Sequence, residues 1–216
     1  MAAEEFPVTT KSRVRRNPKR GIYDKRQVHA ILDEGSVCHV GFVDGGQPFV
    51  IPCFYARDGD RLLLHGATGS RMFQILAKGV EACITVTLLD GLVFARSAFH
   101  HSMNYRSVVC FGRAERIVDR EEKRRALLHM VDSIAPGRGA DARPPNDSEL
   151  KATEVLAFPL TEVSAKVRSG PPVDDPRDME LEVWAGEVPL RLTPQTPVPD
   201  PGLRAGIPCP AYLEEL

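Results

Sequence analysis

The chain has 216 residues, of which 28 are Lys or Arg and 29 are Asp or Glu, so its formal net charge is −1. This balance provides no global field for nucleic acid or an anionic membrane surface, and no apolar run is long enough to span a bilayer. Five cysteines without a CxxC spacing argue against a disulfide framework or a zinc site, and an acidic N-terminus without an apolar segment favours a cytoplasmic protein.

Composition divides the chain into three parts. Residues 1–20 form a basic arm, which we expect to pack on its own domain or on a partner subunit, because no nucleic-acid-binding motif accompanies it. A nucleic-acid contact by this arm is the weaker alternative. Residues 21–168 carry the apolar runs of a folded domain, and residues 169–216 form a Pro-rich C-terminal extension. The domain opens with a predicted helix over residues 24–32, capped by Asp24.

Three apolar runs separated by turn residues predict an antiparallel meander. They cover residues 37–43, 49–55 and 61–65, and the first two are joined by a hairpin turn. Pro52 lies inside the second run and has no N–H to donate. It therefore predicts an edge or a bulge, where backbone groups are free for a ligand.

The third run leads into the stretch around which the chain is organised. A polar turn from Gly66 to Gly69 follows the strand, and Ser70 is expected to cap the next helix. The glycines allow the backbone to approach a ligand closely. Arg71 opposes the helix dipole unless an anion lies nearby. A phosphate would satisfy Ser70, Arg71 and the free N–H groups together, whereas the alternative is an ordinary strand–turn–helix with a solvated arginine.

The rest of the domain predicts further strands and one long amphipathic helix. The helix covers residues 121–134. The further strands are expected over residues 82–88, 91–99 and 105–117 and within 153–166. About six antiparallel strands with two or three helices predict a mainly β, α+β domain, in the form of a small barrel with flanking helices.

Five motifs follow one another along the chain. They are Arg20-Gly21-x-Tyr23-Asp24, Gly46-Gln47-Pro48-x-Val50-x-Pro52-x-x-Tyr55, His65-Gly66-Ala67-Thr68-Gly69-Ser70-Arg71, Asn104-Tyr105-Arg106-Ser107-Val108 and Trp184-Ala185-Gly186-x-x-Pro189-Leu190. In this order they resemble the flavin-nucleotide-binding proteins related to pyridoxamine 5′-phosphate oxidase, in the branch that contains the nitroimidazole-resistance proteins. The resemblance covers roughly residues 15–192.

The resemblance implies a split β-barrel of the antiparallel Greek-key type that binds FMN. It implies a homodimer with the flavin at the subunit interface, while the charge balance predicts neither a nucleic-acid nor a membrane partner. The residues that it places around the cofactor are Val50, Ile51, Pro52, Tyr55, His65, Gly66, Ser70, Arg71, Arg106, Ser107, Lys166 and Trp184.

The resemblance also implies a role for each of these residues. The strand that carries Val50 runs along the flavin edge, and Ser70 and Arg71 hold the ribityl phosphate. Arg106 and its neighbour Ser107 contact the ring from the other subunit. Trp184 covers the flavin as a lid, or alternatively packs the C-terminal segment on the barrel. Met72 stands where the oxidases have a second cation, so Lys166 or Arg168 is expected to supply that charge.

The implied function is an FMN-dependent oxidoreductase that reduces a small acceptor, such as a nitroaromatic compound, with NAD(P)H as a candidate donor. His65 is the catalytic candidate, because an imidazole beside the flavin tunes its potential or delivers a proton; a structural hydrogen bond is the alternative. A flavin-binding or sensing module without turnover remains open, as does a haem-binding split barrel. No spacing of acidic residues and histidines predicts any other metal site.

Overall fold

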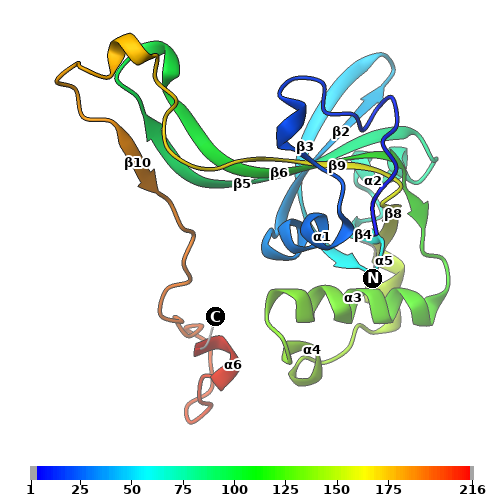
Figure 1. The fold of residues 1–216 in the computed structure, drawn as a ribbon. Helices are drawn as coiled ribbons and strands as arrows, with labels where there is room; N and C mark the ends of the chain where they lie inside the picture. Colours follow the sequence, from blue (N-terminus) through cyan, green and yellow to red (C-terminus); the bar gives the residue numbers. More distant parts are fainter. Residues whose placement is uncertain (1–3, 215–216) are drawn as a thin grey trace.

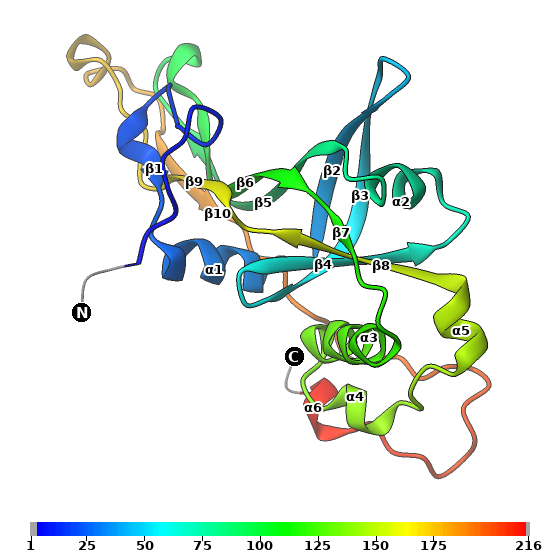
Figure 2. The same cartoon turned by 90° about the vertical axis from the view of Figure 1, so that its right-hand side faces the viewer.

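A computed structural model describes residues 4–214 of the chain. Within that range ten strands form one antiparallel sheet, in the order β1-β9-β6-β5-β2-β3-β4-β8-β7, with β10 paired to β5 (Figures 1 and 2). The strands are β1 (Gly21–Ile22), β2 (Val37–Asp44), β3 (Gln47–Asp58), β4 (Arg61–Ala67), β5 (Glu81–Phe94), β6 (Ser102–Arg113), β7 (Glu115–Arg116), β8 (Thr153–Pro159), β9 (Glu162–Arg168) and β10 (Gly186–Pro189).

The sheet has a Greek-key path. The consecutive strands β2, β3 and β4 pair as a meander, and β5 returns to lie beside β2. The architecture is therefore mainly β and consistent with the expected split barrel, but the expected number of about six strands is too low. β1, β7 and β10 have two to four residues each, which is too short to give a periodic pattern. The run 153–166 holds most of two strands, whereas residues 82–88 and 91–94 belong to one strand with a bulge after Leu89.

Six helices lie among the described residues, together with three short 3-10 turns. The helices are α1 (Lys25–Glu34), α2 (Arg71–Leu76), α3 (Arg120–Ile134), α4 (Arg138–Asp141), α5 (Asp147–Ala152) and α6 (Ala211–Glu214), and the turns are η1 (Pro18–Arg20), η2 (Ala98–His100) and η3 (Pro176–Asp178). Asp24 caps α1 as predicted, because its carboxylate accepts a hydrogen bond from the Gln27 backbone N–H at 2.9 Å.

The leucine run of β4 is buried on both of its faces. Leu62 and Leu64 point into the barrel core, whereas Leu63 points the other way and packs with Met130 of α3. Side chains alternate along a strand, so three consecutive buried leucines require a cover on each side. The barrel interior covers one face of β4 and α3 covers the other (Figure 2), which explains why all three leucines are buried.

Tyr55 ties β3 to α1 from inside the core. Its buried hydroxyl donates a hydrogen bond of 2.6 Å to the carbonyl oxygen of Leu32, one of the last carbonyls of α1. We expect Tyr55→Phe to lower the free energy of unfolding by about 1–2 kcal/mol, because the buried carbonyl loses its partner. Urea denaturation measures this change. Tyr105→Phe serves as the control and is expected to stay within about 0.5 kcal/mol of wild type; equal losses in both variants would contradict the assignment.

Two segments extend the fold beyond the barrel. β5 and β6 continue outwards as a two-stranded arm, and β10 pairs with β5 along it (Figure 1). The chain then returns to α6, where the Tyr212 hydroxyl donates to Asp141 of α4 at 2.6 Å. At the other end, the described part of the N-terminal segment packs on its own domain, with Phe6 in the core. None of the described helices has the length and apolar character needed to cross a membrane.

Candidate functional site

The predicted flavin strand presents two different faces. Val50 is 68% exposed and points away from the core, as does Pro52, whereas Ile51 packs against the core. Pro52 pairs with His39 of β2, and the pairing of β3 with β4 begins only at Tyr55. Pro52 therefore lies at an unpaired edge rather than in a bulge, and there the missing N–H costs no hydrogen bond. The Tyr55 side chain is in the core and does not reach this face.

A cation and a hydroxyl remain free at the turn between β4 and α2. Ser70 is the N-cap residue of α2, but its side chain makes no capping hydrogen bond. The Arg71 guanidinium lies 4.1 Å from the centroid of the Phe49 ring. It forms no ion pair with any of the described residues, although most arginines in the domain do. A cation held on an aromatic face without an anion is available to a phosphate.

Gly66 is required for packing. A Cβ atom at this position would lie 2.4 Å from the Phe73 ring of α2, far inside van der Waals contact. At Gly69, in contrast, an added Cβ atom would meet no heavy atom within 4 Å, and neither glycine has a positive φ. The absence of a side chain at Gly66 thus lets α2 close against β4 and positions the turn that carries Arg71.

His65 faces α3 and lines a cavity of about 380 Å³ between α3, β3 and the loop before α5. Its neighbour across the strands is Phe54, with ring centroids 6.1 Å apart and an interplanar angle of 78°. The imidazole makes no hydrogen bond to any described residue. Desolvation in the cavity lowers the pKa of the imidazole below its ordinary value, although the residue remains exposed. The sequence predicted His65 near the phosphate turn but gave no sign of this cavity.

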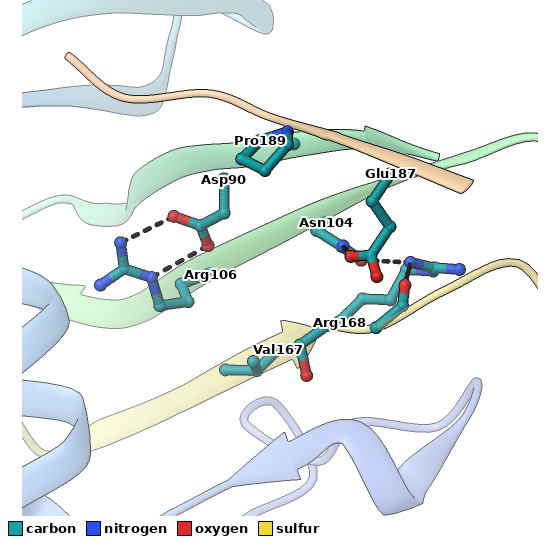
Figure 3. Close-up of a pocket in the computed structure, with 10 residues that line it drawn as sticks. Asp90, Asn104, Arg106, Val167, Arg168, Glu187 and Pro189 are labelled. Atoms are coloured by element: carbon teal, nitrogen blue, oxygen red, sulfur yellow. Dashed lines mark hydrogen bonds and ion pairs between the residues drawn. The ribbon is translucent and has the colours of Figure 1, made fainter. Parts of the chain in front are cut away.

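Arg106 lies in a different cavity, of about 330 Å³, at the base of the arm (Figure 3). Its guanidinium donates to both carboxylate oxygens of Asp90, at 2.9 and 2.7 Å, and also pairs with Glu34 of α1. The hydrogen bonds to Glu34, then those to Asp90, raise the pKa of Arg106 above its ordinary value. Two carboxylates already balance this charge, so Arg106 is a structural link between the arm and α1 within the chain.

Ser107 and Lys166 point away from the core on neighbouring strands, because Val108 and Ala165 beside them point into it. The Ser107 hydroxyl donates to the Lys166 backbone carbonyl at 3.3 Å. Ser107 therefore belongs to the outer face of the sheet, whereas Arg106 lies on the opposite face.

Trp184 is 66% exposed and lies on the arm, with its ring centroid 6.0 Å from that of Phe94. Its position next to β10 leaves most of the indole uncovered by the described residues. The structure thus places this predicted lid far from Arg71 along the sheet, on the segment that extends beyond the barrel.

The predicted site residues therefore form two groups. Val50, Pro52, Ser70 and Arg71 lie around β3 and β4, and Ser107 and Lys166 lie on β6 and β9. β5 and β2 separate the groups, and three inter-strand steps amount to about 14 Å. A ligand that touches both groups must span this face or lie between two chains.

Two features of the molecule escaped sequence reasoning. One is the apolar cavity beside His65, whose only signal was an excess of apolar residues on α3, among them Ile134, which is 59% exposed. The other is a buried contact in which Arg168 donates to Asn104.

No cluster of three or more His, Cys, Asp or Glu side chains that could hold a metal ion occurs among residues 4–214. Cys53 is the cysteine of β3, and burial raises the pKa of its thiol to about 11. Cys53 is therefore not a reactive thiol.

Comparison with known protein families shows to which family the chain belongs. A family model described as pyridoxamine 5′-phosphate oxidase matches residues 24–167, a segment that runs from the cap of α1 into β9. The chain belongs to this family. The resemblance expected from the five motifs is thereby confirmed. No curated protein sequence matches the chain.

Three solved structures extend the comparison. The flavocytochrome Anf3 from Azotobacter vinelandii is 40% identical to this family member, with a TM-score of 0.92, covering 97% of this chain and 98% of that one. An FAD- and haem-binding protein from Mycobacterium smegmatis is 36% identical, with a TM-score of 0.87, covering 91% and 96%. A protein named for 5-nitroimidazole antibiotic resistance, from Bacteroides thetaiotaomicron, is 28% identical, with a TM-score of 0.58, covering 68% and 86%.

Proposed function

We propose that the chain binds a flavin nucleotide and haem and transfers electrons from a donor such as NAD(P)H to a small acceptor. The observation that carries the flavin site is the free Ser70 hydroxyl and Arg71 guanidinium at the turn after β4. The two relatives that are 40% and 36% identical are described as a flavocytochrome and as an FAD- and haem-binding protein, which supports both cofactors. When bound, these groups supply the hydride and one-electron chemistry that side chains lack.

The residues around the turn fit a phosphate-bearing ligand. Arg71 offers a planar fork for phosphate oxygens, and the Phe49 ring holds that fork in place by stacking. Ser70 supplies a hydroxyl donor. Val50 and Pro52 present an exposed apolar surface on the outer face of β3, opposite the face that carries Phe49, and a flat ring system can rest on that surface. The backbone of Ile51 lies between them, while its side chain packs against the core.

We infer that FAD, rather than the FMN expected from the sequence, is the flavin. The 36% identical relative carries FAD in its description, and its alignment extends over 91% of this chain. FMN remains the competing ligand in the binding experiment below. The 28% identical relative, named for 5-nitroimidazole resistance, supports a nitroaromatic compound as a candidate acceptor. Bleaching of the bound flavin by NADH or NADPH under anaerobic conditions distinguishes an enzyme from a binding module.

A homodimer would bring the two groups of predicted residues together. The outer face of the sheet carries exposed apolar side chains on β2 and β3, including Val37 and Val50, and the arm carries Phe99 and Trp184. Such surfaces are typical of protein–protein contacts. In this proposal Ser107, Lys166 and Trp184 of one chain approach Arg71 of the other. Light scattering after gel filtration tests the oligomeric state.

Arg71→Ala tests the flavin site. We expect its affinity for FAD to fall about 10- to 100-fold, because a hydrogen bond to a charged group is worth about 1.5–3 kcal/mol. The measurement is a titration of flavin-depleted full-length protein with FAD and FMN, followed by flavin fluorescence. Arg26→Ala, on the exposed face of α1, is the matched control and keeps the wild-type affinity. Equal affinities for Arg71→Ala and wild type would refute the phosphate role.

A further inference from the structure

The cavity beside His65 has the size and lining of a ligand site. Its volume of about 380 Å³ lies within the range of small-molecule pockets. Leu127, Leu128, Val131 and Ile134 of α3 form one apolar wall, and Phe54 of β3 forms part of the other. Ile134 remains 59% exposed, although Ala126 and Met130 of the same helix are buried against the sheet. The helix therefore carries more apolar surface than the described chain covers.

A single imidazole enters this apolar cavity from β4. His65 lines the cavity and has no hydrogen-bond partner among the described residues, so a ring nitrogen is available to a metal ion. The charged residues of the lining, Arg143 and Glu149, pair with each other at 2.6 Å at the rim. They therefore leave the interior of the cavity to the imidazole and the apolar side chains.

The lone imidazole restricts the class of metal group that would fit. No cluster of three or more potential ligands exists among the residues described, so the protein does not supply a full coordination sphere here. A metal that brings most of its own ligands needs only one axial donor from the protein and an apolar surface for its macrocycle. Haem meets both requirements.

We infer that haem occupies the cavity between α3 and β3–β4, with His65 as an axial ligand of its iron. This inference rests on the proposed function, which includes haem but does not locate it. It gives His65 a role different from the catalytic role beside the flavin that the sequence suggested. It also accounts for the uncovered apolar wall on α3.

The haem cavity would adjoin the proposed flavin face. Phe54, which lines the cavity, and Pro52, on the flavin face, are successive outward-facing residues of β3. Two residues along a strand span about 7 Å. The two sites thus share one strand, which is an arrangement suited to electron transfer between the groups that they hold.

Other histidines are less suited to this role. The Nε2 atom of His129, on α3, lies 2.8 Å from the carbonyl oxygen of Arg57 and is already engaged. His101 lies exposed on the arm, where its Nδ1 atom contacts the carbonyl oxygen of Ser97 at 3.0 Å. No hydrogen bond of its Nε2 atom to a described residue is present, so His101 is one competing ligand, and His39, exposed on β2, is another.

The experiment is a titration of haem-depleted, full-length protein with hemin, followed by the Soret band. We expect wild type to bind one hemin with a histidine-ligated spectrum. His65→Ala should lose at least about tenfold in affinity, since even the loss of residues that only orient a metal ligand costs 10- to 100-fold. Added imidazole should restore the wild-type spectrum in His65→Ala by filling the vacated ligand position. His129→Ala is the control and should match wild type.

A second variant probes the apolar wall without removing the ligand. Ile134→Lys places a charge on an exposed position and is therefore expected to fold, but it should weaken hemin binding while FAD binding stays unchanged. A Soret titration of His65→Ala identical to that of wild type overturns the inference and leaves haem binding itself intact. If His101→Ala is the only variant that loses the Soret band, the inference is also overturned, and the haem site lies on the arm instead. A wild-type protein that retains FAD but binds no hemin refutes the haem part of the proposed function instead.

Discussion

Replacing Gly66 by alanine is expected to lower the free energy of unfolding by about 2–3 kcal/mol. The new Cβ atom would lie 2.4 Å from the ring of Phe73, which is only 3% exposed and has no room to rotate into solvent. Either α2 moves away from β4 or the ring leaves its preferred rotamer. Thermal or urea denaturation of the purified protein measures the loss.

Gly69→Ala is the matched control three residues further on. Its Cβ atom meets nothing within 4 Å, and its φ is not in the left-handed region. The substitution is therefore expected to leave stability unchanged or to raise it by up to about 1 kcal/mol, since alanine restricts the unfolded chain. Equal destabilisation by both substitutions would show that the turn, rather than the contact with Phe73, requires glycine.

A double variant separates packing from ligand binding at Gly66. Phe73→Leu removes the ring that blocks the new methyl group, so Gly66→Ala should cost at least about 1 kcal/mol less in that background. If the double variant regains its fold and also binds FAD like Phe73→Leu alone, the glycine serves the packing of α2. If FAD binding stays lost after the fold is regained, close approach of the ligand is the reason for the glycine.

Local sequence patterns predicted those elements whose formation depends only on residues close together in the sequence. The apolar run at residues 61–65 predicted a strand, which the structure confirms as β4, with α3 on one side of its leucines and the barrel core on the other. Asp24 predicted the start of α1, because a capping side chain acts within one turn. Such signals depend only on neighbours in the sequence.

The candidate site depends on contacts that no local pattern encodes. Alternation along β4 fixes which way His65 points, but only the packing of α3, some 60 residues later, makes that side a cavity. Arg106 and Ser107 are adjacent in the sequence and lie on opposite faces of β6, so they contribute to different surfaces. The partners of Arg106, Glu34 and Asp90, lie 72 and 16 residues away and were likewise invisible in its motif.

Asn104→Ala is expected to release β10 from the arm and to cost about 2–3 kcal/mol of stability. The buried Asn104 amide joins three strands: its oxygen accepts a hydrogen bond from Arg168 of β9, and its nitrogen donates to Glu187 of β10 (Figure 3). Alanine leaves Arg168 with only the Gly170 and Pro171 carbonyl oxygens, at 2.9 and 3.2 Å, and leaves Glu187 without its donor. A buried guanidinium short of partners is costly.

Amide hydrogen exchange locates this loss, because local opening is reported residue by residue. Exchange should accelerate at Gly186, Glu187 and Val188 of β10, which pairs with β5, while β2 to β4 stay protected. The anisotropy of Trp184, the single tryptophan of the chain, should fall as its segment leaves Phe94. Arg26→Ala, on the exposed face of α1, leaves the Asn104 contacts intact and should not change either readout. Unchanged exchange over β10 in Asn104→Ala would mean that its pairing with β5 alone holds the segment, and that Trp184 is positioned without the buried asparagine.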